Sequence, residues 1–313
     1  MPMPDTSPPV IRTTALRKTY NGHPVLDALD LEVHPGEIFA LLGANGAGKT
    51  TTINILTTLI AHDAGAAQVA GFDVASAPDE VRRRIALTGQ SAAVDDMLTA
   101  AENVTMFARL SGMSTRAARR RATALLSDFD LIDVAARRVS TFSGGMRRRL
   151  DLAVSLVVAP TVLFLDEPTT GLDTRSRRAL WQTIRSLATA GTTIFLTTQY
   201  LEEADRLADR IAVLDAGRIV GLGTPQELKS RVGGTSVQLH GADGEVLRSV
   251  ATDGSVGGIR AALDTIDDTG ITGTVSLHSP TLDDVFLTLT GDRPHDSSVA
   301  GTSSAPTRIE ESA

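Results

Sequence analysis

The sequence predicts an α/β protein built on a parallel sheet, and three observations carry that prediction. A continuous apolar run at residues 38–42 leads directly into a glycine-rich segment, GANGAGKT, at residues 43–50. Between residues 162 and 214, short apolar runs alternate with helix-like patterns, as in strands joined by crossover helices. The chain has 313 residues, 42% of them apolar, which is enough for a sizeable core and about two domains.

The first part of the chain is expected to form strands. Residues 1–10 are rich in proline and polar side chains and predict a disordered arm. Residues 11–20 and 27–33 alternate apolar and polar side chains, which predicts half-buried strands. The apolar run 38–42 predicts a buried strand, and a helix is expected to begin near Gly48.

The middle of the chain changes from a helical pattern to an alternating one. At about residues 90–140, apolar side chains recur at helical spacing among arginines and aspartates, which predicts a helical subdomain. The pattern then predicts alternating strands and helices, in the order strand 162–165, helix 176–190, strand 193–197, helix 201–208 and strand 210–214.

The C-terminal part has a different composition. Residues 234–291 are richer in Gly, Thr, Asp and Val and predict a small α+β accessory domain, with strands around 237–239 and 275–277 and a helix at 259–266. Residues 292–313 are expected to be a disordered tail.

One stripe near the end of that domain needs a partner. Its residues follow the i, i+3, i+4, i+7 spacing of a helix with one buried face. Two interpretations stay open: the stripe packs on the domain's own strands, or it contacts another subunit. The stripe consists of Leu282, Val285, Phe286 and Leu289.

Composition excludes several classes of function. The net charge of −7 argues against a broad basic face for nucleic acid, and without cysteine there is no disulfide framework. The longest apolar run, 152–165, is shorter than the ~20 residues of a membrane helix and contains Pro160, and the N-terminus lacks a secretory signal pattern. We expect the protein to stay in the cytoplasm. The arginine runs at 82–84, 119–121 and 147–149 predict solvated helix faces.

The spacing Gly-x4-Gly-Lys-Thr within residues 43–50 predicts a phosphate-binding loop. Glycines let backbone N–H groups curl around phosphate oxygens, and the following helix N-terminus adds partial positive charge. Lys49 is expected to reach the β and γ phosphates, and Thr50 to bind Mg²⁺ through its hydroxyl. The predicted contact residues are Gly43, Asn45, Gly46, Gly48, Lys49, Thr50 and Thr51.

Asp166 and Glu167 follow a predicted buried strand, where a pair of carboxylates is costly to desolvate without a purpose. Asp166 is expected to hold Mg²⁺, and Glu167 to polarise the attacking water as a catalytic base. Two acidic residues after a strand are commonly just a solvated loop, but the phosphate loop upstream argues against that interpretation here.

The order of three motifs identifies a family. The phosphate loop, then TFSGGMRRRL at residues 141–150, then VLFLDEP at residues 162–168, resembles the nucleotide-binding subunit of an ATP-binding cassette (ABC) transporter, over roughly residues 11–230. The resemblance implies a P-loop NTPase cassette, ATP and Mg²⁺ as cofactors, a homodimer, and a separate membrane permease. It also implies a peripheral location on the cytoplasmic face of the cell membrane.

The Ser-Gly-Gly segment opens a predicted helix, so its N–H groups and hydroxyl can present donors to an anion. The resemblance implies that it contacts the γ-phosphate of ATP held by the opposite subunit. Phe142 and Met146 differ from the commoner leucine and glutamine of the family motif. The contact residues are Ser143, Gly144 and Gly145.

Three further site residues rest on the resemblance. Tyr20 lies where an aromatic ring stacks on adenine, although a packed core aromatic is the alternative. Gln90 lies where a glutamine links Mg²⁺ and water to the permease interface. Asp173 lies in a loop that crosses the dimer, and it could equally cap the helix beginning near Thr174.

Gln199, in TTQYLEEAD, departs from the family, since most members have a histidine there that contacts the γ-phosphate. Glutamine can donate a hydrogen bond but cannot become cationic or shuttle a proton. We expect a catalytic role with slower or less pH-sensitive hydrolysis; the alternative is that Gln199 only starts the following helix.

A narrower resemblance rests on Gln199 together with TGQSAAVDDMLT (residues 88–99) and SPTLDDVFLTLTG (residues 279–291). These segments are similar to the daunorubicin-resistance class of drug-export ATPases, which implies efflux of a drug or natural product. The alternative is a soluble ABC-type ATPase acting on ribosomes or nucleic acid, but neither a second cassette nor a long coiled-coil insertion is visible. A GTP switch would need an Asn-Lys-x-Asp segment, which the sequence lacks.

Overall fold

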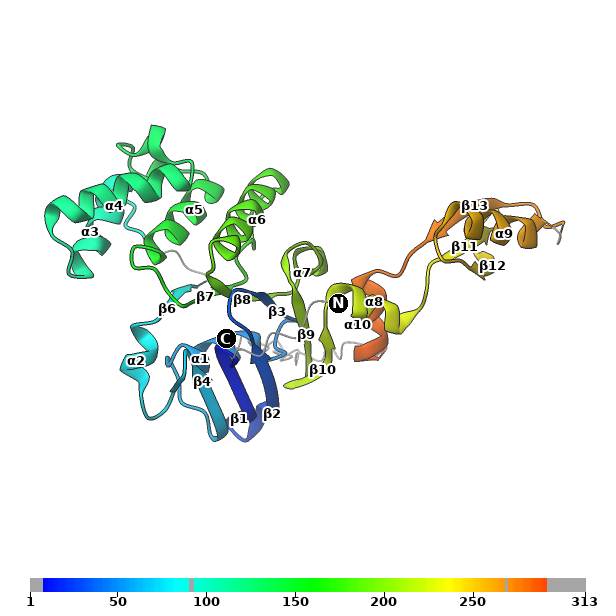
Figure 1. Ribbon diagram of the computed structural model, residues 1–313, viewed down its shortest axis with the longest axis horizontal. Coiled ribbons are helices and arrows are strands. Elements are labelled where there is room, and N and C mark those ends of the chain that lie inside the picture. Colours follow the sequence, from blue (N-terminus) through cyan, green and yellow to red (C-terminus); the bar gives the residue numbers. More distant parts are fainter. Residues whose placement is uncertain (1–7, 90–92, 268–269, 292–313) are drawn as a thin grey trace, which may run out of the picture.

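The computed structural model describes residues 8–89, 93–267 and 270–291, and its centre is a six-stranded sheet (Figure 1). The strand order is β10-β9-β3-β8-β7-β6, parallel throughout except for the antiparallel pair β9–β10. This confirms the predicted parallel sheet. Its strands are β3 (Ile38–Gly43), β6 (Ile85–Thr88), β7 (Val162–Asp166), β8 (Thr193–Thr198), β9 (Arg210–Asp215) and β10 (Arg218–Gly223).

The central strands are apolar because helices or a second sheet cover both of their faces. Every residue of β3, β7 and β8 is buried. On one face Phe39, Phe164 and Phe195 pack together, with centroids 5.6 Å apart in both adjoining pairs. Helix α1 (Lys49–Leu56) shares that core, whereas α6 (Thr174–Thr189) and α7 (Leu201–Leu207) contribute to the core of the other face.

A second, antiparallel sheet lies beside the first, with the order β2-β1-β4-β5. Residues 1–10 were predicted to be a disordered arm, yet Val10 is buried and its N–H donates to the carbonyl of Val33 at 2.7 Å. The order therefore begins before β1, and residues 1–7 lie outside the described part. The strands are β1 (Ile11–Tyr20), β2 (His23–Val33), β4 (Ala64–Val69) and β5 (Phe72–Asp73).

The helical lobe is larger than the interval 90–140 predicted from the sequence, because α5 packs on α3 and α4 and extends the lobe to residue 155. Thr99 and Glu102 form a capping box that starts α3. No helix in the described ranges is long and apolar enough to cross a bilayer. The segments of the lobe are α3 (Ala100–Leu110), α4 (Thr115–Asp128), η1 (Ile132–Val134), η2 (Val139–Thr141) and α5 (Gly144–Ser155), whereas α2 (Pro78–Arg82) packs on β5 and β6 outside the lobe.

The accessory unit projects away from the cassette on two extended connections (Figure 1). Its three-stranded sheet has the order β12-β11-β13, and α9 packs on β11 and β12. Sequence reasoning found two of the strands and the helix but missed β12, and it also missed β10 and α8 (Pro225–Val232). The elements of the unit are β11 (Ser236–His240), β12 (Val246–Ala251), α9 (Val256–Asp267) and β13 (Thr274–His278).

The last helix, α10 (Leu282–Thr290), does not belong to the accessory unit. Its predicted apolar stripe packs on α8, α7 and β10, and Leu282 and Val285 join the large core of the cassette. Both open interpretations are therefore wrong, because the cassette of the same chain buries the stripe, rather than the unit's own strands or another subunit. Helical spacing shows that a face must be buried but does not name its partner. Residues 234–291 thus divide into a projecting unit and a helix that returns to the cassette.

Candidate active site

The phosphate loop joins the end of β3 to the start of α1, as predicted. Gly48 has φ +109°, and a Cβ there would lie 2.8 Å from the carbonyl oxygen of Val25 and from the Leu26 side chain. Only glycine satisfies both the backbone angle and the lack of space. The tight turn places the N–H groups at the start of α1 at the mouth of the loop.

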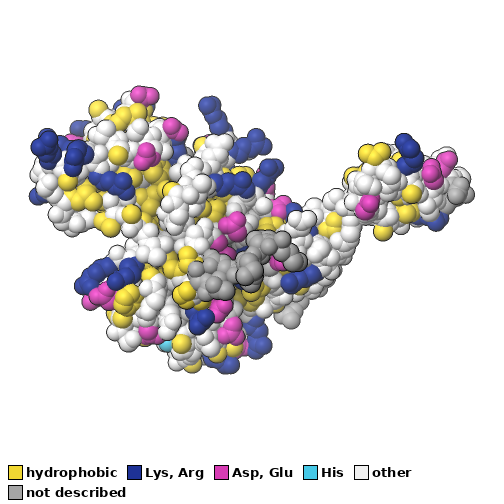
Figure 2. Space-filling model, viewed as in Figure 1, with side chains coloured by type: hydrophobic (Ala, Val, Ile, Leu, Met, Phe, Trp, Pro, Cys, Tyr) yellow, Lys and Arg dark blue, Asp and Glu magenta, His cyan; other side chains and the backbone are white. Residues whose placement is uncertain are grey.

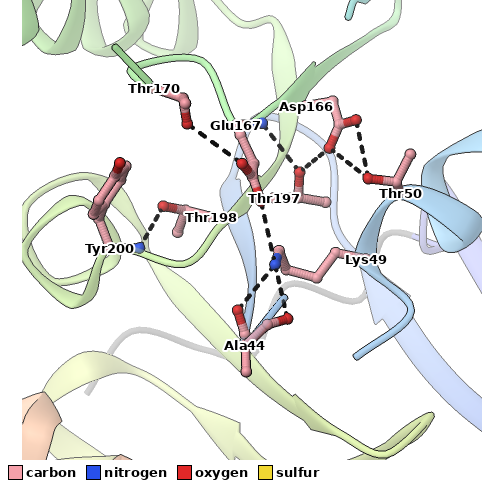
Figure 3. Close-up of polar contacts among 10 residues, drawn as sticks. Ala44, Lys49, Thr50, Asp166, Glu167, Thr170, Thr197, Thr198 and Tyr200 are labelled. Atoms are coloured by element: carbon pink, nitrogen blue, oxygen red, sulfur yellow. Dashed lines mark hydrogen bonds and ion pairs between the residues drawn. The ribbon is translucent and has the colours of Figure 1, made fainter. Parts of the chain in front are cut away.

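Lys49 lies at the centre of the loop, with its side chain only 4% exposed (Figure 3). Its Nζ donates to the carbonyls of Gly43 and Ala44, each at 3.0 Å, and lies 3.3 Å from Glu167 Oε1. A buried ammonium needs such partners. The residues predicted to bind phosphate and to activate water are therefore in contact with each other.

Asp166 is buried where β7 ends, and two hydroxyl groups face its carboxylate (Figure 3). Thr197 Oγ1 donates to Oδ1 at 2.6 Å, and Thr50 Oγ1 donates to Oδ2 at 3.2 Å. Carboxylate and hydroxyl oxygens suit Mg²⁺, which is usually held by one or two protein oxygens together with phosphate oxygens and water. The pair Thr50 and Asp166 therefore fits a Mg²⁺ site, although no cluster of three His, Asp or Glu occurs in the described ranges.

Glu167 has a strained backbone, with φ +46°. Such a conformation in a residue other than glycine costs on the order of 1–3 kcal/mol and is concentrated at functional sites. Its N–H donates to the carbonyl of Thr197 at 3.1 Å, and its Oε2 accepts from Thr170 Oγ1 at 3.3 Å. The carboxylate is thereby held between Lys49 and Thr170.

A cavity of about 550 Å³ lies in front of the loop. Tyr20 stands at its edge and is 44% exposed, so the alternative of a packed core aromatic is wrong. Lys18 Nζ lies 5.4 Å from the centroid of the Tyr20 ring. The cavity is lined by Tyr20, Val25, Asn45, Gly46, Gly48, Lys49, Thr50, Thr51 and Glu167.

The Ser-Gly-Gly segment and Asp173 lie beside each other, at the first turns of α5 and α6. Ser143 Oγ accepts from the N–H of Met146 at 3.3 Å, and Asp173 accepts from the N–H of Ser176 at 2.9 Å, which confirms the predicted cap. The hydrogen bonds from Ser176 hold the pKa of Asp173 below its usual range. A Cβ on Gly145 would collide with Ser176 Oγ, so glycine permits the close packing of the two helix starts.

These residues do not line the phosphate cavity of their own chain. Gly144 instead lines a second cavity of about 260 Å³, together with Arg148, Glu167 and residues 170–172. Gln90 lies outside the described residues.

Gln199 lies close to the phosphate loop without lining its main cavity. It shares a cavity of about 390 Å³ with Gly43, Ala44 and Asn45, and Phe286 of α10 also lines that cavity. The helix that follows begins at Leu201, with Tyr200 as its N-cap residue. Gln199 therefore lies one residue before the helix cap and beside the loop, and its contact with phosphate stays a prediction.

Sequence reasoning missed several polar groups around the site. Thr197 bonds both acidic residues of the site, and Glu203 is fully buried and accepts from Trp181 Nε1 at 3.0 Å. Burial raises the pKa of Glu203.

The run 147–149 was predicted to be a solvated face, but its three side chains are only 32%, 11% and 22% exposed. By contrast, Arg119 and Arg120 of α4 are exposed, and Figure 2 shows arginines over that lobe.

The family of the chain follows from its similarity to known proteins. Residues 26–170 match the family model described as ABC transporter. The chain is 49% identical to the daunorubicin resistance ATP-binding protein DrrA2 of Streptomyces coeruleorubidus, over 90% of this chain and 95% of that protein. It belongs to the ATP-binding subunits of ABC transporters. The predicted family, cassette fold and ATPase class are thereby confirmed.

Other ABC subunits extend the comparison. The chain is 39% identical to the Nod factor export ATP-binding protein I of Burkholderia orbicola, over 90% of this chain and 97% of that protein. A solved ATP-binding subunit of an ABC transporter has a TM-score of 0.63 at 29% identity and covers 71% of this chain and 92% of its own. A solved dimeric cassette, bound to ADP and Pi in a post-hydrolysis state, has a TM-score of 0.62 at 25% identity. The match covers 68% of this chain and 98% of the chain of that structure.

Proposed function

We propose that two copies of this ABC subunit hydrolyse Mg·ATP between them and drive export of a drug or natural product through a separate permease. The complex would lie on the cytoplasmic face of the cell membrane. The observation that carries the proposal is the convergence of Lys49, Asp166 and Glu167 on one cavity, with the hydroxyls of Thr50 and Thr197 on Asp166.

Binding is assigned to the phosphate loop and to Tyr20. The Lys49 ammonium would pair with the β and γ phosphates, and the N–H groups at the start of α1 would donate to phosphate oxygens. Phosphate oxygens would then compete with Glu167 for Lys49, which would free the carboxylate. The exposed Tyr20 ring at the rim of the cavity would stack on adenine.

Thr50 and Asp166 would hold Mg²⁺, with Gln90 as the further ligand implied by the family resemblance. When bound, Mg²⁺ neutralises charge on the β and γ phosphate oxygens. Thr197 would orient Asp166 for this role, because its hydroxyl donates to Oδ1 at 2.6 Å, while the Thr50 hydroxyl lies 3.4 Å from Oδ1 and 3.2 Å from Oδ2. The acceptor geometry of Asp166 is thus fixed by β8 and α1 together.

Glu167 would accept a proton from the attacking water. Its strained backbone and its contacts with Lys49 and Thr170 fix the carboxylate, so little reorganisation is needed when the reaction begins. Gln199 would donate its amide N–H to the γ-phosphate from the neighbouring cavity.

The Ser-Gly-Gly segment supports a homodimer. Ser143, Gly144 and Gly145 open α5, but Gly144 faces the second cavity rather than the phosphate cavity of its own chain. Their N–H groups are therefore available to the nucleotide of a partner copy. Asp173, at the adjoining start of α6, would contact the partner across the same surface.

The substrate class rests on relatives. Proteins similar over nine tenths of this chain are named for daunorubicin resistance and for Nod factor export, and both names denote outward movement or resistance. We infer export of a drug or natural product and take the fluorescent anthracycline daunorubicin as the probe.

Reconstitution with the cognate permease tests the proposal. Inside-out vesicles containing both proteins should accumulate daunorubicin when Mg·ATP is added, whereas vesicles with Lys49→Ala should not, since that variant lacks the phosphate cation. The Arg120→Met variant, changed on the exposed face of α4, serves as the matched control and should transport normally. ATP hydrolysis without any accumulation of the anthracycline would contradict the substrate class.

A further inference from the structure

Arg148 lies between the helical lobe and the strand end that bears the acidic residues of the site. It belongs to α5, five residues after the N-cap Ser143, and its side chain is only 11% exposed. It does not line the phosphate cavity. A buried guanidinium must find acceptors for its N–H groups, and those acceptors show what it connects.

The guanidinium donates to three backbone carbonyls from two other segments. Nη1 donates to Gly89 at 2.6 Å, directly after β6. Nε donates to Pro168 at 2.9 Å and Nη2 to Asp166 at 3.4 Å, on either side of Glu167. One side chain of α5, which the Ser-Gly-Gly segment opens and which we call the signature helix, thus bonds the strand end that carries the predicted metal ligand and the predicted base.

Asp151, one turn further along α5, completes the arrangement. Its Oδ2 lies 3.4 Å from Arg148 Nη1, and its Oδ1 accepts from the N–H of Ala93 at 2.8 Å. The aspartate is 5% exposed, and burial raises its pKa while burial lowers the pKa of Arg148. The two residues therefore bond the backbone at Gly89 and at Ala93, the described residues on either side of 90–92.

Burying such a pair brings little stability. Desolvation of two ions offsets most of their attraction, and apolar residues of similar size are often as stable. The contacts instead span segments that are far apart in the sequence, since Gly89 is 59 residues from Arg148. The arrangement fixes the position of α5 relative to β6 and β7.

We propose that Arg148 and Asp151 form a positioning pair that holds the signature helix in register with the carboxylates of the ATP site. The inference rests on the proposed roles of Glu167 and of the Ser-Gly-Gly segment. Through this pair, a shift of α5 produced by contact with a partner's nucleotide would move the backbone around Glu167 in the same chain. Arg148 lines the second cavity beside Gly144 and Glu167, but neither residue of the pair lines the phosphate cavity, so the effect of the pair is on turnover.

The test compares turnover with nucleotide affinity in the full-length chain. Arg148→Met should lower kcat by about 10- to 100-fold, because small misplacements of catalytic groups have effects of this size. The Kd for a fluorescent ATP analogue should change by less than about twofold, since no contact of Arg148 involves the phosphate loop. Arg148→Lys keeps the charge opposite Asp151 but cannot reach three carbonyls at once, and it should have an intermediate kcat.

Arg149→Met is the matched control, because Arg149 bonds the carbonyl of Phe129 and approaches Asp130 within the helical lobe alone. Its kcat should stay near that of the wild type. Trp181, the single tryptophan of the chain, reports folding of each variant by its fluorescence. If Arg148→Met does not fold, the kcat and the nucleotide Kd of Arg148→Lys test the positioning role of Arg148 instead.

Wild-type kcat in folded Arg148→Met or Arg148→Lys would overturn the inference, and so would an equal loss in Arg149→Met. A loss of affinity in the Arg148 variants that matched or exceeded the loss of kcat would also overturn it. An inactive wild type would instead refute the proposed function, so the two failures are distinguishable.

Discussion

The central strands of the cassette are fully buried, whereas strands β12 and β13 of the accessory unit are largely exposed. In the cassette, β3, β7 and β8 have no exposed residue, whereas in the accessory unit most of β12 and β13 is exposed. Val275 and Leu277 are 44% and 53% exposed, because α9 covers only β11 and β12. A half-covered sheet of this kind cannot hold polar groups in fixed geometry away from water.

The same difference appears in the polar groups. In the cassette, buried Lys49 and Asp166 are each held by two or more partners. Among the described residues of the accessory unit, 236–267 and 270–278, one partly buried bond between side chains joins His240 Nε2 and Ser276 Oγ at 2.8 Å. The predicted site residues therefore lie in the cassette, and we propose that the accessory unit contacts the partner subunit or the permease.

The largest effect is expected at the phosphate loop. Lys49→Ala removes the cation that would pair with the β and γ phosphates and should abolish tight nucleotide binding. Equilibrium titration with a fluorescent ATP analogue measures this, with Arg120→Met as the control. Unchanged affinity would move the nucleotide site away from the loop.

Removal of the accessory unit should separate transport from nucleotide binding. Replacing residues 236–278 by a short Gly/Ser linker leaves α8 and α10 in place, so ATP affinity should be retained while membrane association with the permease is lost. Full export by this variant would show that the unit is dispensable. Truncation after Ser230 also removes α10 and exposes the core around Leu228, so that variant should in addition lose stability.

A smaller effect is expected at Gln199. Gln199→His should maintain or raise ATPase activity and add a pH dependence near the imidazole pKa of ~6.5, because a titratable donor would then face the γ-phosphate. The activity profile from pH 6 to 8 measures this against Gln199→Ala. If both variants matched the wild type throughout, Gln199 would have no phosphate role.

The smallest effect concerns stability alone. Burial raises the pKa of Glu203 above 4.5, so the folded state binds more protons than the unfolded state between that value and the raised pKa, and stability falls as pH rises through this window. Glu203→Gln keeps an acceptor for Trp181 and should raise Tm at pH 7–8, because the free energy of unfolding gains about 1.4 kcal/mol for each pKa unit of the shift. The gain should vanish near pH 4.5; a gain independent of pH would exclude ionisation as its cause.

Local spacing explains what could be predicted. Lys49 and Thr50 follow from the loop pattern, and the cap by Asp173 from its place before a helix, because those contacts involve residues close in sequence. Thr197 and Arg148 could not be predicted, because their partners become neighbours only through the strand order β8-β7-β6 and the docking of α5. For α10, the helical spacing of the apolar residues was predicted correctly, but the surface that covers them was not. Spacing shows which residues share a face and does not show against which surface that face is buried.

The central claim is that Glu167 activates water, whereas Lys49 and the rest of the phosphate loop bind the nucleotide. Glu167→Gln replaces the carboxylate with an amide of similar shape that cannot accept the proton, so turnover should fall on the order of 10²–10⁴-fold. The variant should still bind ATP and should accumulate as an ATP-bound dimer, which size-exclusion chromatography with ATP will detect. Turnover equal to that of the wild type in the purified variant would contradict the account.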